Sequence, residues 1–188
     1  MRSAPGVRVA GGSLRGRRLT TPVAIRPSGT RLREALFSIW APRLTGATFL
    51  DLYAGSGAVG IEALSRGADF AVFVERDREA LASLRENLRL VPGGRARLLA
   101  RSALEALELL AREGARFDLL FADPPYDRPL DPGLADRMAR VAAPGASWAF
   151  EHRHGGATPD PGTRWSAALP RTYGDSVLAF YEVVQKGE

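Results

Sequence analysis

The 188-residue sequence contains no cysteine and has only two histidines. Without cysteine the chain can form neither a disulfide framework nor a thiolate metal site. The histidines, His152 and His154, are separated by one residue and lack a third ligand beside them, so they make a poor metal site. We therefore expect a protein that binds no metal.

Long apolar runs are also missing. No segment approaches the length that a membrane-spanning helix needs, and the N-terminal stretch MRSAPGVRVAGG lacks the apolar core of a secretory signal. Hydrophobic residues make up 45% of the chain, which is enough for a sizeable core and too many for a disordered protein. We expect one main domain in a cytoplasmic protein that acts as a monomer and has no membrane partner.

Acidic residues are absent from the first 33 positions. The net charge is +5, and the 26 basic residues are 25 arginines and Lys186. Residues 1–33 hold eight of the arginines, so residues 34–188 carry 18 basic and 21 acidic groups. A general preference for arginine over lysine does not explain the missing acids. Clustered arginine is typical of phosphate binding, so we expect an RNA-binding extension, with a merely solvated tail as the alternative. The candidate RNA contacts are Arg8, Arg15, Arg17, Arg18 and Arg26.

From residue 47 onward the apolar pattern alternates between strand and helix. Strands are expected at 47–54, 70–75, 96–100, 117–123 and 145–152, and helices at 57–66, 77–90, 103–112 and 131–142. This alternation predicts an α/β fold, with a Rossmann-like, mostly parallel sheet and helices on both faces. The last two apolar runs, 165–173 and 176–184, are separated by a Gly-Asp turn. We expect them to pair as a C-terminal antiparallel hairpin that brings the sheet to seven strands.

The segment before this sheet has a different pattern. Residues 7–20 are expected to form two short strands around a Gly-Gly turn. A helix with an N-cap among residues 28–30 is expected to follow and to stop at Pro42. We place a boundary after residue 25, with a basic β-hairpin extension at 1–25 and the main domain at 26–188.

The stretch DLYAGSGAVG, residues 51–60, contains G-x-G-x-x-G between a strand and a helix, and Glu75 lies at the end of the next strand. Both features occur in dinucleotide-binding sites, although a glycine turn can also form without any ligand. Asp51 separates the candidates, because a carboxylate just before the glycines would repel a pyrophosphate and attract an ammonium group. S-adenosylmethionine has an ammonium, a ribose diol and no phosphate. We therefore favour this methyl donor over NAD, with Glu75 on the ribose hydroxyls.

A second motif, FADPPY, ends the strand expected at 117–123. The Asp123 carboxylate and the Pro124 carbonyl offer two acceptors to the two N–H groups of a planar amine, and so aim the nitrogen lone pair at a methyl group. Pro125 fixes the backbone, and Tyr126 offers a ring on which a flipped base can stack. The motif predicts methylation of an amino group, mainly through positioning. A rigid loop that only closes the strand is the alternative.

Four segments of the chain, RVAGGSLRGRRL, IRPSGTRLREALFSIW, LDLYAGSGAVGIEALSRGA and FADPPY, carry a family resemblance. The chain resembles the bacterial small-subunit ribosomal RNA guanine-N2 methyltransferases, which belong to the class I S-adenosylmethionine-dependent superfamily. The resemblance covers nearly the whole chain. It implies transfer of one methyl group to the 2-amino group of a guanine in 16S rRNA, within an assembled or assembling small subunit.

The resemblance also implies roles for particular residues. The RPSGTRLRE segment lies against the cofactor pocket in the family. Ser102 stands where the superfamily often has Asp or Asn to hold the adenine amine, and Thr30 stands where relatives often have an acid. The implied catalytic residues are Asp123, Pro124, Pro125 and Tyr126. The implied cofactor contacts are Thr30, Arg31, Asp51, Tyr53, Gly55, Gly57, Glu75, Arg76, Ser102, Ala103 and Asp123.

Two other functions are compatible with these motifs. The same fold and cofactor could serve a DNA or other RNA amino-methyltransferase acting on adenine N6 or cytosine N4, but the chain is too small to include a domain that reads duplex sequence. An NAD-binding or non-catalytic RNA-binding Rossmann protein is the second alternative. Asp51 argues against NAD, and the intact DPPY sequence argues against a loss of catalysis.

Overall fold

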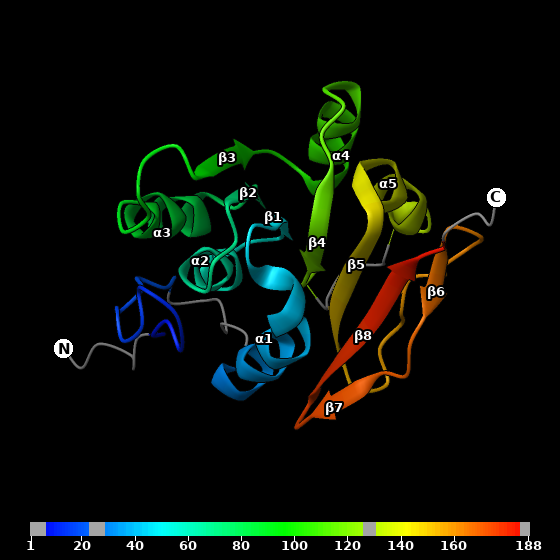
Figure 1. Cartoon of the computed structure of the whole chain (residues 1–188), viewed down its shortest axis with the longest axis horizontal. Helices are drawn as coiled ribbons and strands as arrows, with labels where there is room; N and C mark the ends of the chain where they lie inside the picture. Colours follow the sequence, from blue (N-terminus) through cyan, green and yellow to red (C-terminus); the bar gives the residue numbers. More distant parts are fainter. Residues whose placement is uncertain (1–6, 23–28, 126–130, 185–188) are drawn as a thin grey trace.

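The computed structural model of the chain describes residues 7–22, 29–125 and 131–184 (Figure 1). Within these ranges the chain forms five helices and eight strands. The helices are α1 (Thr30–Leu44), α2 (Ala58–Ser65), α3 (Arg78–Leu88), α4 (Ala103–Arg112) and α5 (Leu134–Val141). The strands are β1 (Thr48–Leu52), β2 (Phe70–Glu75), β3 (Ala96–Ala100), β4 (Phe117–Ala122), β5 (Ala142–Arg153), β6 (Trp165–Ala167), β7 (Arg171–Tyr173) and β8 (Ser176–Val183). Between residues 47 and 153, every expected element is present, and its ends move by at most three residues.

The strands form one sheet in the order β3-β2-β1-β4-β5-β8-β6, and β7 also pairs with β8. The first five strands of this order are parallel, and β8 is antiparallel to β5, β6 and β7. The order reverses direction between β1 and β4. In open α/β sheets, ligands bind at such a point, outside the carboxyl ends of the strands.

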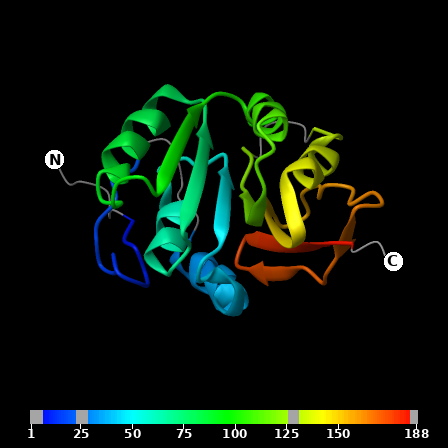
Figure 2. The same cartoon turned by 45° about the horizontal axis from the view of Figure 1, so that its top comes forward.

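Helices cover both faces of the sheet, as the sequence predicts. Alternate residues of each strand point to opposite faces. Phe49, Phe73 and Phe121 pack with α1 and α2, whereas Leu50, Val72 and Leu120 pack with α4 and α5. The two layers are visible on either side of the sheet in Figure 2. The expected α/β, Rossmann-like fold is therefore confirmed.

The sheet has eight strands instead of the predicted seven, because the run 165–173 is split. Its first part is β6 and its last part is β7, and both pair with β8. Pro170, between them, has no N–H to donate to a ladder, and Leu169 is 88% exposed. The predicted hairpin across Gly174-Asp175 is present as β7 and β8.

The helix that was expected to stop at Pro42 continues to Leu44. A proline inside a helix removes one N–H bond, here the bond to the carbonyl of Ser38. Ser38 is exposed, so its carbonyl can bond to water instead. The cost is small in the last turn, and Pro42 does not end the helix.

Residues 7–20, which we call the arm, keep the outline of a hairpin but not its two strands. A single antiparallel bridge joins Arg8 and Arg18, and the chain turns between residues 11 and 16. Val9 and Leu19 are only 2% and 1% exposed and belong to the same apolar cluster as α1 and α2. The predicted boundary after residue 25 falls outside the described residues. The separate extension at 1–25 stays a prediction, although its described part packs into the core of the domain.

Among the described helices, none is both long enough and apolar enough to span a bilayer.

Candidate active site

The carboxyl edge of the parallel strands brings together three of the expected site residues. β1 lies between β2 and β4, and Leu52 pairs in register with Val74 on one side and with Ala122 on the other. The residues that come next along the three strands are Tyr53, Glu75 and Asp123. They therefore end adjacent strands at the point where the strand order reverses, where a ligand is expected.

The glycine loop between β1 and α2 combines open backbone with close packing. Gly55 has a φ of +55°, and a Cβ added there would meet no atom within 4 Å. A Cβ on Gly57 would collide with the side chain of Leu84, and one on Gly60 would collide with the ring of Phe73. Gly57 and Gly60 thus let α2 approach α3 and β2. Gly55 leaves its backbone accessible to a ligand.

Glu75 ties this loop to the turn after β2. Its Oε2 accepts a hydrogen bond from the amide of Gly55 at 2.8 Å, and its Oε1 accepts from the amides of Arg76 and Asp77 at 2.7 and 2.8 Å. These bonds fix the carboxylate at the edge of the sheet. Because a carboxylate oxygen can accept two hydrogen bonds, Oε2 keeps capacity for a ligand hydroxyl. Its predicted contact with a ribose is compatible with this geometry and stays a prediction.

Tyr53, directly after β1, has a strained backbone with a φ of +59°. Left-handed residues other than glycine are uncommon and gather at ligand sites. Burial raises the pKa of the Tyr53 hydroxyl, the nearby charge of Asp131 raises it further, and Arg76 lowers it. Arg76, a second expected cofactor residue, and Asp131 are thus the charges that act on the Tyr53 hydroxyl.

Asp131 was not predicted as a site residue. Its Oδ1 accepts a hydrogen bond from the amide of Gly133 at 2.7 Å and contacts Arg137 at 3.3 Å. It therefore fixes the turn that leads into α5. The available signal was the sequence Asp131-Pro132-Gly133, because an aspartate often bonds to the backbone two residues on and so forms a turn.

Asp51 lies under the glycine loop. It is 1% exposed, and its Oδ2 accepts a hydrogen bond from the amide of Gly60 at 2.9 Å. Burial raises its pKa to about 7, against the lowering effect of the Gly60 bond, and the charge of Glu75 adds to the rise. Asp51 thus holds the first turn of α2 in place. Contact with the ammonium of a cofactor stays a prediction.

The raised pKa of Asp51 predicts a pH dependence of stability. The folded state binds this proton more tightly than the unfolded state, in which the pKa is near 3.8. The contribution of Asp51 to the free energy of unfolding should therefore be full below about pH 4 and decline as the pH rises towards 7. Asp51→Asn should remove this component. Denaturant titrations of both proteins across this range check the result, and equal pH slopes would contradict it.

Ser102 and Ala103 begin α4. The Ser102 hydroxyl donates to Oε2 of Glu105 at 2.7 Å and accepts from the amide of Glu105 at 3.4 Å, and Glu105 in turn bonds to the amide of Ser102. This reciprocal arrangement is a capping box, which explains a serine at this position without a ligand. The predicted contacts of Ser102 and Ala103 with an adenine stay predictions.

Asp123, Pro124 and Pro125 carry the chain away from the end of β4. Asp123 and Pro124 are half-buried, and Pro125 is exposed. Tyr126, the fourth expected catalytic residue, lies outside the described residues. Asp123 and Pro124 therefore lie at the same edge of the sheet as Glu75. Their carboxylate and carbonyl are the two acceptors predicted for an amine.

Thr30 and Arg31 are the exposed first residues of α1. One turn further on, the buried Arg33 contacts Glu62 of α2 through its Nε at 3.3 Å. This contact sets the start of α1 beside α2, the helix that follows the glycine loop. Thr30 and Arg31 thus begin a helix that is held beside α2, and their contact with a cofactor stays a prediction.

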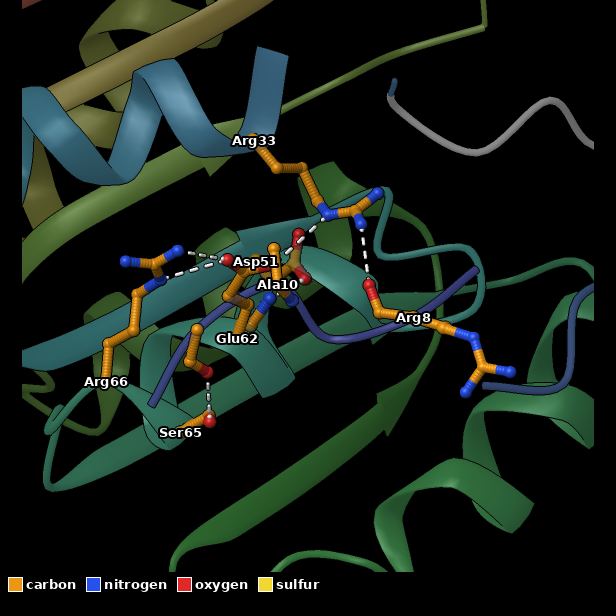
Figure 3. Close-up of polar contacts among 9 residues, drawn as sticks. Arg8, Ala10, Arg33, Asp51, Glu62, Ser65 and Arg66 are labelled. Atoms are coloured by element: carbon orange, nitrogen blue, oxygen red, sulfur yellow. Dashed lines mark hydrogen bonds and ion pairs between the residues drawn. The ribbon is translucent and has the colours of Figure 1, made fainter. Parts of the chain in front are cut away.

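The arm is held against α1 and α2 by a buried polar cluster (Figure 3). Glu62 lies between Arg33 and Arg66, and its Oε2 also accepts from the amide of Ala10 at 3.3 Å. Arg33 donates to the carbonyl of Arg8 at 2.9 Å. Ser65 accepts from the amide of Leu14 at 2.8 Å and donates to the carbonyl of Gly11 at 2.6 Å. The arm therefore has a fixed position on the domain.

The expected RNA-binding arginines of the arm face solvent. All four that the structure describes are exposed, and the guanidinium of Arg8 donates to the carbonyl of Gly16 at 2.8 Å. The four are Arg8, Arg15, Arg17 and Arg18. Arg26 lies outside the described residues. In the parts of the chain that are described, no group of three His, Cys, Asp or Glu side chains is arranged to hold a metal ion.

Comparison with known proteins adds to this geometry. Ribosomal RNA small subunit methyltransferase D of Escherichia coli strain K12 is 41% identical over 126 residues, which make up 66% of this chain and 62% of that protein. The match thus spans less than two thirds of the relative. A solved structure of a hypothetical protein from Thermus thermophilus is 37% identical, with a TM-score of 0.80, and covers 94% of this chain and 99% of that one.

A methyltransferase from Agrobacterium tumefaciens, 16% identical with a TM-score of 0.65, covers 85% of this chain and 63% of its own length and shows the same class I methyltransferase fold. A family model described as Conserved hypothetical protein 95 matches residues 7–182. That range includes the arm, the glycine loop and the loop that begins at Asp123. The chain therefore belongs to the family Conserved hypothetical protein 95.

Proposed function

We propose that this protein methylates the 2-amino group of a guanine in 16S rRNA of the small ribosomal subunit, with S-adenosylmethionine as the methyl donor. The observation that carries the proposal is the meeting of Glu75, the open backbone of Gly55 and the Asp123-Pro124 acceptors at one strand edge. The 41% identity to a small-subunit rRNA methyltransferase supports the choice of RNA.

The edge of the sheet suits the proposed cofactor. Its fixed carboxylate, Glu75, is a hydrogen-bond acceptor for a diol, and Gly55 leaves the backbone open beside it. The Glu75 carboxylate adds negative charge beside the open backbone of Gly55, which disfavours a pyrophosphate and favours a ligand with an ammonium. When bound, S-adenosylmethionine supplies an electrophilic methyl group on its sulfonium.

The residues of this chain position the amine. The Asp123 carboxylate and the Pro124 carbonyl each accept one N–H of the guanine 2-amino group, which turns the nitrogen lone pair towards the methyl carbon. The sulfonium of the methyl donor would serve as the leaving group. The nitrogen would gain the methyl group and lose one proton, and the Asp123 carboxylate, which accepts one of its N–H groups in this proposal, would take that proton. Catalysis of this kind depends mainly on orientation.

The arm supplies the RNA contact in this proposal. Four exposed arginines and no acid lie between residues 7 and 20, on a segment fixed to α1 and α2. Such a surface neutralises backbone phosphates without reading the base sequence. The target guanine is then selected by the shape of the small subunit around it.

Mass mapping of 16S rRNA from cells that lack the gene tests the proposed function. One missing methyl group on one guanine, restored when purified protein and S-adenosylmethionine are added to the small subunits, is the expected result. A methyl group lost from an adenine, a cytosine or DNA would assign a different amino-methyltransferase activity. An unchanged methylation pattern would exclude the proposal.

Replacement of Glu75 tests the cofactor site. Glu75→Ala should weaken the binding of S-adenosylhomocysteine by about 2–3 kcal/mol, because hydrogen bonds to a charged group are worth this much. Isothermal titration measures the change, and thermal unfolding shows whether the fold survives. Glu79→Ala, which removes an exposed carboxylate from the first turn of α3, is the matched control and should bind normally. Unchanged affinity in Glu75→Ala would remove this residue from the site.

A further inference from the structure

Asn87 joins the arm to the glycine loop. It lies in the last turn of α3 and is 2% exposed. Its Oδ1 accepts from the amide of Thr20, and its Nδ2 donates to the carbonyl of Thr20, both at 2.8 Å. The same Nδ2 donates to the carbonyl of Ser56, also at 2.8 Å. Since an amide nitrogen carries two hydrogens, each carbonyl receives one of them.

The two segments that Asn87 joins have different proposed partners. Thr20 ends the arm, two residues after Arg18, and Ser56 lies between Gly55 and Gly57 in the glycine loop. Three other side chains hold the arm. Arg33 of α1 bonds to the carbonyl of Arg8, and Glu62 and Ser65, one to two turns into α2, bond to residues 10–14 of the arm. Among the hydrogen bonds of the described residues, those of Asn87 are the ones that connect the arm to the loop itself.

We propose that Asn87 is a positioning residue that couples RNA binding on the arm to cofactor binding at the glycine loop. This inference rests on the proposed function of the site. Ordering of Thr20 by bound RNA fixes the Asn87 amide, which in turn fixes the carbonyl of Ser56. The same peptide carries the amide of Gly57, which donates to the carbonyl of Ala54 at 2.7 Å, so the turn of the glycine loop is fixed as well. The coupling is reciprocal by thermodynamic necessity, so the cofactor must also order the arm.

The reciprocal direction can be tested without RNA. Hydrogen exchange of the Thr20 amide should slow when saturating S-adenosylhomocysteine is added to the full-length protein. We expect at least about 5-fold slowing, the lower end of common coupling factors. In Asn87→Ala the cofactor should leave the exchange of residues 19–21 unchanged. Asn87→Asp, which keeps the size of the side chain but cannot donate to Ser56, should behave in the same way.

Ser65→Ala is the matched control. It removes the hydroxyl that binds Leu14 and Gly11, so it loosens the arm at a site that does not touch the glycine loop. The exchange of Leu14 should become faster in this variant, while the cofactor-dependent slowing at Thr20 remains. A general loosening of the arm would instead abolish the cofactor effect in both Ser65→Ala and the Asn87 variants, and that result would overturn the proposal.

The forward direction uses purified small ribosomal subunits as the RNA probe. They should tighten the binding of S-adenosylhomocysteine to the wild-type protein and to Ser65→Ala by about 5-fold or more, and should not change it in the Asn87 variants. If the wild-type protein binds S-adenosylhomocysteine and the exchange of the Thr20 amide does not change, the coupling is overturned, but the proposed function is not. Failure to bind S-adenosylhomocysteine at all overturns the proposed function together with it. The wild-type measurement decides the question even if an Asn87 variant fails to fold.

Discussion

Asp123→Ala should reduce methyl transfer to small ribosomal subunits by about 100-fold or more, the range found when a group that accepts protons at a reacting atom is removed. The reason is that, in the proposed function, Asp123 accepts a hydrogen bond from the amine whose bonds change, and this bond is strongest in the transition state. The binding of S-adenosylhomocysteine should stay close to normal. Single-turnover methylation with saturating enzyme measures the effect apart from substrate binding.

Two further variants sharpen this result. Asp123→Asn keeps the shape of the side chain and one neutral acceptor oxygen but loses the charge and the ability to take a proton, so its rate should lie between those of the alanine variant and the wild type. Asp136→Ala removes an exposed carboxylate from the first turn of α5 and should retain normal activity. Near-normal single-turnover rates in both Asp123 variants would refute the catalytic role.

Replacing Arg15, Arg17 and Arg18 by alanine should weaken the binding of small-subunit RNA and flatten its salt dependence. Each phosphate contact contributes roughly 0.7–0.9 to the slope of log K against log salt, so the loss of three contacts should lower the slope by about 2. Binding titrations at several salt concentrations measure it. The cofactor affinity in the absence of RNA should not change.

A control triple variant tests whether the effect on RNA binding depends on the position of the arginines in the arm or only on the loss of three positive charges. Arg112, Arg116 and Arg164 are exposed and lie at the amino edge of the sheet, next to the end of α4 and the starts of β4 and β6. Their replacement removes the same charge and should leave the salt slope almost intact. Equal losses in the two triple variants would show that net charge, and not the arm, attracts the RNA. Point substitutions are preferable to deleting the arm because Val9 and Leu19 are part of the core.

Local patterns in the sequence were sufficient to predict the five parallel strands of the sheet. The apolar runs at 70–75 and 96–100 form strands with the expected bounds. The pattern of apolar residues within such a segment is enough to identify the element. The split of 165–173 into two strands depends on where β8 pairs, which is a long-range property. The persistence of α1 past Pro42 depends on the exposure of a single carbonyl, which a sequence does not show.

Some features of the candidate site could also be predicted from the sequence, and others could not. The sequence predicted that Glu75 and Asp123 lie at the ends of strands, and parallel strands end at a common edge. The capping of α4 by Ser102 and Glu105 is a local Ser-x-x-Glu pattern that the sequence does contain. The sequence did not show that Asp51 is buried under Gly60 or that Asn87 bonds to Thr20 and Ser56. These contacts arise when segments meet in three dimensions. Asn87 and Thr20, for example, are 67 residues apart in the chain.

The wide separation between the arm and its anchors has a consequence for synthesis. The arginines of the arm leave the ribosome first, but the anchoring side chains Glu62, Ser65 and Asn87 follow 51–67 residues after the backbone groups that they bind. Chains are made from the N-terminus at about 5–20 residues per second, so the arm stays undocked for several seconds. During this interval the nascent chain already exposes its arginine cluster to ribosomal RNA, while the glycine loop is still without the Asn87 bond that joins it to the arm.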